Sequence, residues 1–183
     1  MGRLESIWAG WRSEYVERAA AESAASTAED AADSGCVMCR LVAADPGDDD
    51  AGVVWRGHSV TVAMNAYPYT SGHVMVIPHL HVGDLEALGA EESTAVWSAA
   101  VASVQAVKAA YRPDGVNFGA NLGSAAGAGI PGHVHLHVLP RWAADTNFMT
   151  SVASARVLPE ALPVSLGKLR AAWPLVVPRA EPR

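Results

Sequence analysis

The chain has 183 residues, half of them hydrophobic, which is enough for one domain with a sizeable core. Its net charge of −6 argues against a protein that binds nucleic acid regardless of sequence, because such a protein needs a clustered excess of lysine and arginine. No stretch reaches the roughly 18 apolar residues of a membrane span, and the first residues lack the apolar core of a secretory signal, so we expect neither a nucleic-acid nor a membrane partner.

The first part of the chain predicts a helix followed by a loop. Trp8, Trp11 and Tyr15 recur at helical spacing within Leu4–Ala25, which indicates a helix whose aromatic stripe docks on the core. The small and polar residues behind it indicate a loop that ends near residue 35.

The next segment predicts the first strands of a sheet. Short β-branched or apolar runs at Val53–Trp55 and Ser59–Met64, separated by three turn-forming residues, indicate a hairpin. A turn-rich connection then leads from Asn65 to a third strand, His73–Ile77, which Pro78 closes.

The pattern of residues 90–111 gives the clearest prediction of a helix. Apolar side chains recur every three or four positions, two glutamates occupy the first turn, where the helix dipole favours negative charge, and Pro113 follows the end. A fourth strand at 116–120 and a glycine-rich loop lead into a fifth strand that carries three histidines. One long helix among consecutive strands predicts an α+β fold on a mostly antiparallel sheet of about five strands.

The last part of the chain adds minor elements. Residues 152–158 indicate a further strand, residues 160–173 a last helix, and residues 174–183 a C-terminal tail. We expect all of them to belong to a single domain of residues 1–183.

His133, His135 and His137 alternate with apolar residues, so on a strand they would share one face while the apolar side chains anchor the other. Three interpretations compete. The histidines can bind a metal such as zinc, they can form a solvated strand face, or a neutral imidazole among them can attack phosphorus. Three of the seven histidines within five residues make the solvated face the weakest of these.

The stretch from Gly132 to Pro140, Gly-His-Val-His-Leu-His-Val-Leu-Pro, resembles the signature of the histidine-triad family at every position. The resemblance extends over residues 65–77, 121–129 and 140–149 and covers about residues 4–173. It is closest to the diadenosine tetraphosphate phosphorylase branch, and it implies the histidine-triad fold with terminal helices added.

The resemblance implies the catalytic roles. His135 would be the nucleophile that attacks an α-phosphate and forms a nucleotidyl-histidine intermediate. His133 and His137 would orient and polarise it, and His73 matches a further family histidine near the phosphates. Such a phosphorus–nitrogen bond is labile, so one difficult displacement is divided into two easier ones without a cofactor in the nucleophilic step.

The resemblance also implies where a nucleotide binds. Asn65 would contact a ribose hydroxyl, the strand that holds Met64 would flank the base, and Asn121 would lie beside the phosphates. Glycines in the loop before the triad leave backbone amides open to an anion. The predicted nucleotide-binding residues are Asn65, Met64, Asn121, Gly127, Gly129, Arg141, Trp142 and Asn147, of which Trp142 is equally well explained as ordinary core.

The segment Ala128-Gly129-Ile130 stands where many family hydrolases carry Gln and Ser or Thr, and where phosphorylase relatives can carry a Gly-Ser pair. The side-chain donor is therefore absent, and phosphate and water stay open as alternative second nucleophiles.

The two cysteines, Cys36 and Cys39, lie too close together to staple a secreted fold, which fits a reducing cytoplasm. Their spacing is half of a zinc site. Some histidine-triad relatives complete such a site with residues that match His81 and His133, which implies a structural zinc. A pair of buried thiols and a thioredoxin-like motif are the alternatives.

The sequence thus predicts a cytoplasmic, homodimeric histidine-triad enzyme that cleaves dinucleoside polyphosphates, preferably diadenosine tetraphosphate with inorganic phosphate as the second substrate. The dimer is carried over from the family. Hydrolysis of dinucleoside polyphosphates or of nucleoside phosphoramidates is the alternative within the family. A nucleotide-binding adaptor with little turnover is the alternative outside enzymes.

Overall fold

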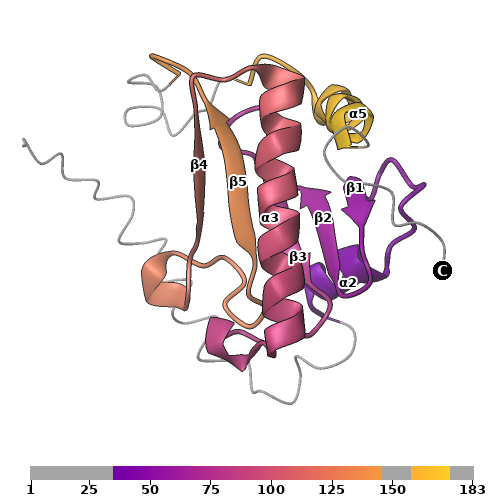
Figure 1. Cartoon of the computed structure of the whole chain (residues 1–183), viewed down its shortest axis with the longest axis vertical. Helices are drawn as coiled ribbons and strands as arrows, with labels where there is room; N and C mark the ends of the chain where they lie inside the picture. Colours follow the sequence, from indigo (N-terminus) through magenta and orange to yellow (C-terminus); the bar gives the residue numbers. More distant parts are fainter. Residues whose placement is uncertain (1–34, 146–157, 174–183) are drawn as a thin grey trace, which may run out of the picture.

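The computed structural model describes residues 35–145 and 158–173 (Figure 1). The predicted N-terminal helix, nearly all of the loop behind it, Asn147, almost the whole strand predicted at 152–158 and the C-terminal tail lie outside these residues. Within the described residues, no helix is long and apolar enough to cross a bilayer.

A five-stranded sheet forms the centre of the protein, in the order β1-β2-β3-β5-β4. Every neighbouring pair is antiparallel, which confirms the predicted fold class. The hairpin, the third strand and the fourth strand lie where the sequence predicted them. The strands are β1 (Val53–Arg56), β2 (Val60–Met64), β3 (Val74–Pro78), β4 (Gly115–Ala120) and β5 (Leu136–Arg141).

The long helix α3 (Ala90–Tyr111) crosses one face of the sheet, with the same bounds as the predicted helix (Figure 1). Glu91 and Glu92 lie in its first turn, where their carboxylates interact favourably with the helix dipole. Arg112 adopts a left-handed backbone with φ of 46° and ends the helix just before Pro113.

The main core lies between α3 and the sheet. Val62, Val76 and Val138 are fully buried there, one from each of the three central strands. The short helix α5 (Leu162–Ala172) extends this core with Leu166 and Leu169, which confirms the last predicted helix with a start two residues later.

A second, smaller core lies on the other face of the sheet. The helix α2 (Val37–Ala43) packs Met38 against Ala63, Met75 and Ile77 of β2 and β3. Because α2 begins just after Cys36, this packing brings both cysteines to the face opposite α3 (Figure 1). Two single-turn helices, η1 (Leu85–Ala87) and η2 (Ser124–Ala126), lie in the connections.

The fifth strand begins at Leu136, so the prediction of one strand carrying all three histidines is wrong in extent. His133 and His135 precede the strand because the local backbone bonds elsewhere. The backbone N–H of Val134 donates to Val82 at 2.7 Å, and that of His133 donates within a turn to Ile130 at 3.4 Å. The alternation of faces still holds, since the apolar residues between the histidines all lie in the core beneath α3.

Candidate active site

Four histidines gather on the sheet face opposite α3. His137 on β5 pairs with Met75 on β3, and its ring lies 5.1 Å from that of His73 and 4.9 Å from that of His135, measured between centroids. The structure therefore brings together the predicted catalytic set, with His133 adjoining through the backbone.

Hydrogen bonds assign the protons along one chain of this cluster. The backbone N–H of Tyr69 donates to Nδ1 of His73 at 3.2 Å, so the proton of that imidazole is on Nε2. Nε2 of His73 then donates to Nδ1 of His137 at 3.0 Å. The neutral His137 consequently carries its proton on Nε2 and has a donor left for another group.

A second hydrogen bond assigns the proton of His135. Its Nδ1 lies 2.9 Å from the backbone oxygen of His133, and only an N–H can face a carbonyl at that distance. Nε2 of His135 therefore keeps its lone pair. The side chain is 6% exposed, so the ring is held by the protein while its nucleophilic nitrogen is defined.

Burial keeps two of these imidazoles, His133 and His137, neutral. Desolvation, with a smaller contribution from His135, lowers the pKa of His137 to about 4. Desolvation also lowers the pKa of His133, partly offset by the hydrogen bond to Pro78 and reinforced by His81 and His135. Near neutral pH these imidazoles carry no charge, which is the form that can accept and donate protons at defined nitrogens.

Two cysteines and two histidines form a candidate metal centre beside this cluster. One ligand atom from each of Cys36, Cys39, His81 and His133 lies within 4.8 Å of all the others. Sγ of Cys39 lies 3.1 Å from Nδ1 of His81, and both sulfurs lie 3.5 Å from Nδ1 of His133.

This donor set fits zinc. Tetrahedral zinc with Zn–S and Zn–N bonds of about 2.3 and 2.0 Å places sulfur and nitrogen ligands about 3.5 Å apart. In addition, Nε2 of His133 faces the oxygen of Pro78 at 2.9 Å and so carries the proton, which leaves Nδ1 as a ligand atom aimed at the thiols. The four predicted metal residues are thus together and correctly oriented for a metal ion.

The structure brings only some of the predicted nucleotide-binding residues to the face of the sheet that carries the histidines. Asn65 follows β2, accepts the N–H of Tyr67 at 2.9 Å through its Oδ1, and donates its own N–H to the oxygen of His73 at 3.0 Å. Met64 is 6% exposed and belongs to the core beneath α3. The structure therefore brings Asn65, but not Met64, to the histidine face.

Asn121, Gly127 and Gly129 lie in the connection from β4 to the histidine segment. Gly127 has φ of 89°, a conformation that side-chain-bearing residues rarely adopt, and a side chain there would meet no atom within 4 Å. Within this loop the N–H of Gly127 donates to the oxygen of Ser124 at 2.9 Å, and the N–H of Ala128 donates to the oxygen of Gly123 at 3.3 Å. The role of the loop in binding phosphate therefore stays a prediction.

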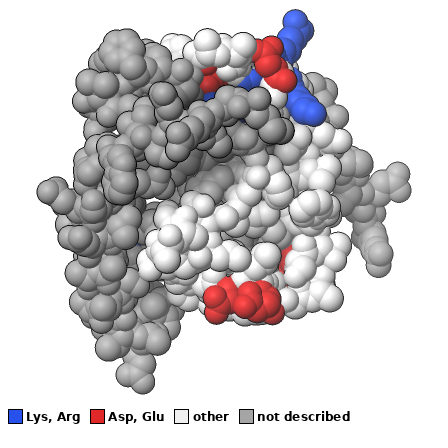
Figure 2. Space-filling model, turned by 90° about the vertical axis from the view of Figure 1, so that its left-hand side faces the viewer, with Lys and Arg blue, Asp and Glu red and all other residues white. Residues whose placement is uncertain are grey.

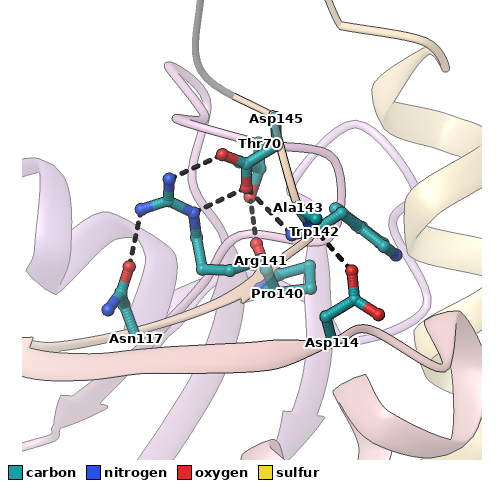
Figure 3. Close-up of polar contacts among 8 residues, drawn as sticks. All are labelled: Thr70, Asp114, Asn117, Pro140, Arg141, Trp142, Ala143 and Asp145. Atoms are coloured by element: carbon teal, nitrogen blue, oxygen red, sulfur yellow. Dashed lines mark hydrogen bonds and ion pairs between the residues drawn. The ribbon is translucent and has the colours of Figure 1, made fainter.

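Arg141, at the end of β5, lies in a polar network (Figure 3). Its guanidinium makes two hydrogen bonds of 2.6 Å to the carboxylate of Asp145 and one of 2.7 Å to Oδ1 of Asn117. Asp145 also accepts the backbone N–H of Trp142 at 3.0 Å, and Asp114 accepts that of Ala143 at 2.8 Å. These bonds fix the turn that follows β5.

Trp142 packs edge-on against Tyr111 of α3, with ring centroids 6.1 Å apart. The side chain is half-buried and belongs to neither core cluster, so its role in nucleotide binding stays a prediction. Sequence reasoning missed Tyr69, whose ring lies 4.8 Å from that of His73 and 6.1 Å from that of His137. An aromatic residue four positions before a predicted catalytic histidine, in a turn, was the available signal.

Comparison with known proteins identifies the family. The model of the HIT domain matches residues 47–144. AP-4-A phosphorylase from Mycobacterium tuberculosis is 32% identical over 93% of this chain and 85% of its own length. The chain belongs to the HIT family. These matches confirm the predicted histidine-triad family, its AP-4-A phosphorylase-like branch and the prediction of an enzyme.

Other HIT relatives agree. The crystal structure of a Zn-bound histidine triad family protein from Mycobacterium smegmatis superimposes with a TM-score of 0.57 at 32% identity, covering 76% of this chain and 93% of that one. The asymmetrical bis(5'-nucleosyl)-tetraphosphatase of Schizosaccharomyces pombe is 32% identical over 51% of this chain and 50% of its own length. The HIT fold is therefore shared with known members.

Proposed function

We propose that this HIT protein cleaves dinucleoside polyphosphates through a nucleotidyl-histidine intermediate on His135, preferably diadenosine tetraphosphate by phosphorolysis. The observation that carries the proposal is the 2.9 Å hydrogen bond from Nδ1 of His135 to the oxygen of His133, because it places the proton on Nδ1 and leaves Nε2 unprotonated with its lone pair available to attack phosphorus. The substrate class follows the AP-4-A phosphorylase and the tetraphosphatase among the relatives.

In the first step, Nε2 of His135 attacks the α-phosphorus. A phosphorus–nitrogen bond forms, the bond from phosphorus to the bridging oxygen breaks, and its electron pair leaves with that oxygen on the released ATP. In the second step, a phosphate oxygen attacks the same phosphorus and releases His135, so the product is ADP. Water in that role would release AMP instead.

His137 supplies a proton donor to this reaction. Its Nε2 carries the proton because its Nδ1 accepts from His73, and its ring lies 4.9 Å from that of His135. An N–H at this distance from the nucleophile can donate to a phosphoryl oxygen as negative charge develops on it. Asn65 and the loop that holds Gly127 and Gly129 supply the contacts to ribose and phosphate.

The centre formed by Cys36, Cys39, His81 and His133 holds a structural zinc in this proposal. Bound zinc would cross-link α2 to the segment that follows β3, through His81, and to the segment that precedes β5, through His133, and would take no part in the displacement at phosphorus. The thiols fit a reducing compartment such as the cytoplasm.

A homodimer is also part of the proposal. β4 is an edge strand of the sheet, and beside it lie three exposed apolar side chains: Trp97 is 61%, Val101 45% and Phe118 43% exposed. The described residues on this side carry charge only towards its two ends (Figure 2). An uncharged patch next to a strand that lies at the sheet edge among the described residues favours pairing with a second copy. We take residues 1–183 as the single domain of each copy.

The decisive experiment is product analysis with diadenosine tetraphosphate, with and without inorganic phosphate. We expect ADP plus ATP only when phosphate is present, and no product from His135→Asn. AMP plus ATP without phosphate would contradict phosphorolysis and establish hydrolysis. A third outcome is that the wild-type protein binds diadenosine tetraphosphate but converts neither it nor a nucleoside phosphoramidate. That outcome would contradict the proposed reaction and support the hypothesis of a nucleotide-binding adaptor.

A further inference from the structure

His133 belongs to two sites at once. Its side chain offers Nδ1 to the metal centre, 3.5 Å from both sulfurs. Its backbone oxygen accepts the proton of His135 at 2.9 Å. A single residue therefore connects the four metal-binding side chains to the nucleophile.

Burial and two short hydrogen bonds hold His133 in place. The side chain is fully buried, Nε2 donates to the oxygen of Pro78 at 2.9 Å, and the next backbone N–H, of Val134, donates to Val82 at 2.7 Å. The remaining ring nitrogen, Nδ1, faces the thiols of Cys36 and Cys39. Two neutral thiols are weak hydrogen-bonding groups, whereas a metal bond from Nδ1 fixes both the position and the plane of the ring.

The orientation of the His133 peptide determines which nitrogen of His135 is nucleophilic. A neutral imidazole has two tautomers of similar energy, and the bond to the His133 oxygen selects the one with the proton on Nδ1. His135 is 6% exposed, so water replaces that bond poorly if the carbonyl turns away. The other tautomer has its proton on Nε2 and no lone pair there for phosphorus.

We propose that the metal centre positions the nucleophile: metal bound by Cys36, Cys39, His81 and His133 holds the His133 peptide so that His135 keeps its proton on Nδ1. The two cysteines and His81 are thus positioning residues that act through His133. The expected effect on turnover rests on the function proposed above, whereas the effect on the proton of His135 does not.

The test compares the metal-loaded protein with the Cys36→Ser variant and with wild-type protein stripped by a chelator and reloaded with zinc. Bound zinc is quantified in each sample. Nitrogen-15 NMR of the histidine rings reports which nitrogen of His135 carries the proton, with His135→Asn identifying the signal. Leu169→Ala serves as the matched control, because it weakens the core beneath α3 without touching the metal centre.

We expect about one zinc per chain, a single His135 tautomer with the proton on Nδ1, and a mixture of tautomers after zinc is lost. Turnover should fall about tenfold or more with little change in KM, the size of effect typical when the support of a site residue is removed. Reloading zinc should restore both, and Leu169→Ala should change neither at a temperature where it is folded.

Two outcomes would overturn the inference. One is a zinc-free protein whose His135 keeps its proton on Nδ1, and the other is a protein that binds no zinc at all. If no sample converts diadenosine tetraphosphate, the proposed function fails, but the NMR comparison still decides the coupling. A loss of activity in Leu169→Ala equal to that in Cys36→Ser would reduce the metal effect to general stability and also contradict the inference.

Discussion

Nε2 of His73 lies 3.0 Å from Nδ1 of His137, and the opposite nitrogen of His73 accepts the backbone N–H of Tyr69 at 3.2 Å. This chain starts at a backbone group and so sets the tautomers of both histidines without any charge. Through this chain the buried side chain of His73 would contribute to the reaction proposed at His135.

The first prediction concerns His73. The substitution His73→Leu keeps a bulky buried side chain but removes the fixed donor to His137, so the proton of His137 is no longer confined to Nε2. We expect kcat to fall about a hundredfold, the lower range of what a positioned acid contributes, with little change in KM. Steady-state kinetics on diadenosine tetraphosphate measure this. His58→Leu, the same change at an exposed histidine of the β1–β2 turn, should leave kcat unaltered, and an equal loss there would contradict the assignment.

The second prediction concerns pH and stability. Burial, and to a lesser degree His135, lowers the pKa of His137 to about 4 from an ordinary value of 6.5. Between these values the unfolded chain binds a proton that the folded chain does not, so stability rises with pH from about 4 to 6.5 and is fully present above that range. Burial also lowers the pKa of His133 and of His79, which makes the free energy of unfolding rise more steeply with pH.

The measurement is the urea midpoint at pH 5 and pH 7. The wild-type midpoint should be lower at pH 5, and His137→Gln should show a smaller difference between the two pH values. A variant with the same difference as the wild type would show that His137 does not titrate in this window.

Much of this site was predictable because periodicity determines which face a side chain occupies. The alternation around His135 placed the imidazoles opposite the apolar residues, and that holds even though the strand begins only at Leu136. The extent of the strand was not predictable, since it depends on a bond from Val134 to Val82, more than fifty residues away in sequence. Arg141 and Asp145, by contrast, form an ion pair only four residues apart, which depends on the turn after β5 and not on strand periodicity.

Met64 illustrates a different limit. The sequence places Met64 at the end of a strand beside Asn65. The residues of the strand itself do not indicate which face of the sheet the long helix covers. The register of β2 puts Met64 on the α3 side, in the core, one residue before the chain turns to the histidine face. Assignment of the face required the tertiary packing of α3 and α2, which has no signature within the strand.

The third prediction concerns Gly72, which precedes His73 with φ of 80°. A Cβ at this position would lie 2.5 Å from the ring of Tyr111. Gly72→Ala therefore adds backbone strain and overpacking, and should destabilise the protein by about 2–4 kcal/mol. Gly127→Ala is the matched control, because Gly127 has a similar φ of 89° with no atom within 4 Å of its Cβ.

Denaturant unfolding separates the two contributions. Gly127→Ala should cost only the backbone part, about 1–2 kcal/mol. Adding Tyr111→Leu to Gly72→Ala should recover some of the steric cost by opening the space. Equal destabilisation in both alanine variants would argue against a clash with Tyr111.

The fourth prediction tests the homodimer. Trp97 on α3 packs edge-on against Phe118 on the edge strand β4, with ring centroids 5.7 Å apart, and both side chains are exposed. A charge in the middle of an apolar interface loses its hydration, so Trp97→Arg should dissociate the dimer. Sedimentation velocity at micromolar concentration measures the mass. Val164→Arg, at a half-exposed apolar position on α5, should stay dimeric. A wild-type monomer would refute the proposed assembly.

The last prediction separates two roles for Arg141. Its guanidinium already makes paired bonds to Asp145 and a third to Asn117 (Figure 3). Lysine cannot reproduce such a planar, bidentate contact. The Arg141 side chain is 38% exposed, so loss of the pair should cost less than about 1 kcal/mol of stability. A rise in KM that corresponds to more than about 1 kcal/mol of binding free energy therefore cannot come from lost stability. It would report on the shape of the turn or on a direct contact to the nucleotide.

A double-mutant cycle distinguishes these roles. If Arg141 acts by fixing the turn through Asp145, then Arg141→Lys and Asp145→Asn should raise KM for diadenosine tetraphosphate by similar factors, and the double variant should be no worse than either, because both changes break the same bonds. If Arg141 instead contacts the nucleotide directly, Asp145→Asn leaves its charge in place, and the two effects should differ and add. The ion pair seen here favours the non-additive outcome, which would make Asp145 as important to binding as the arginine that the sequence singled out.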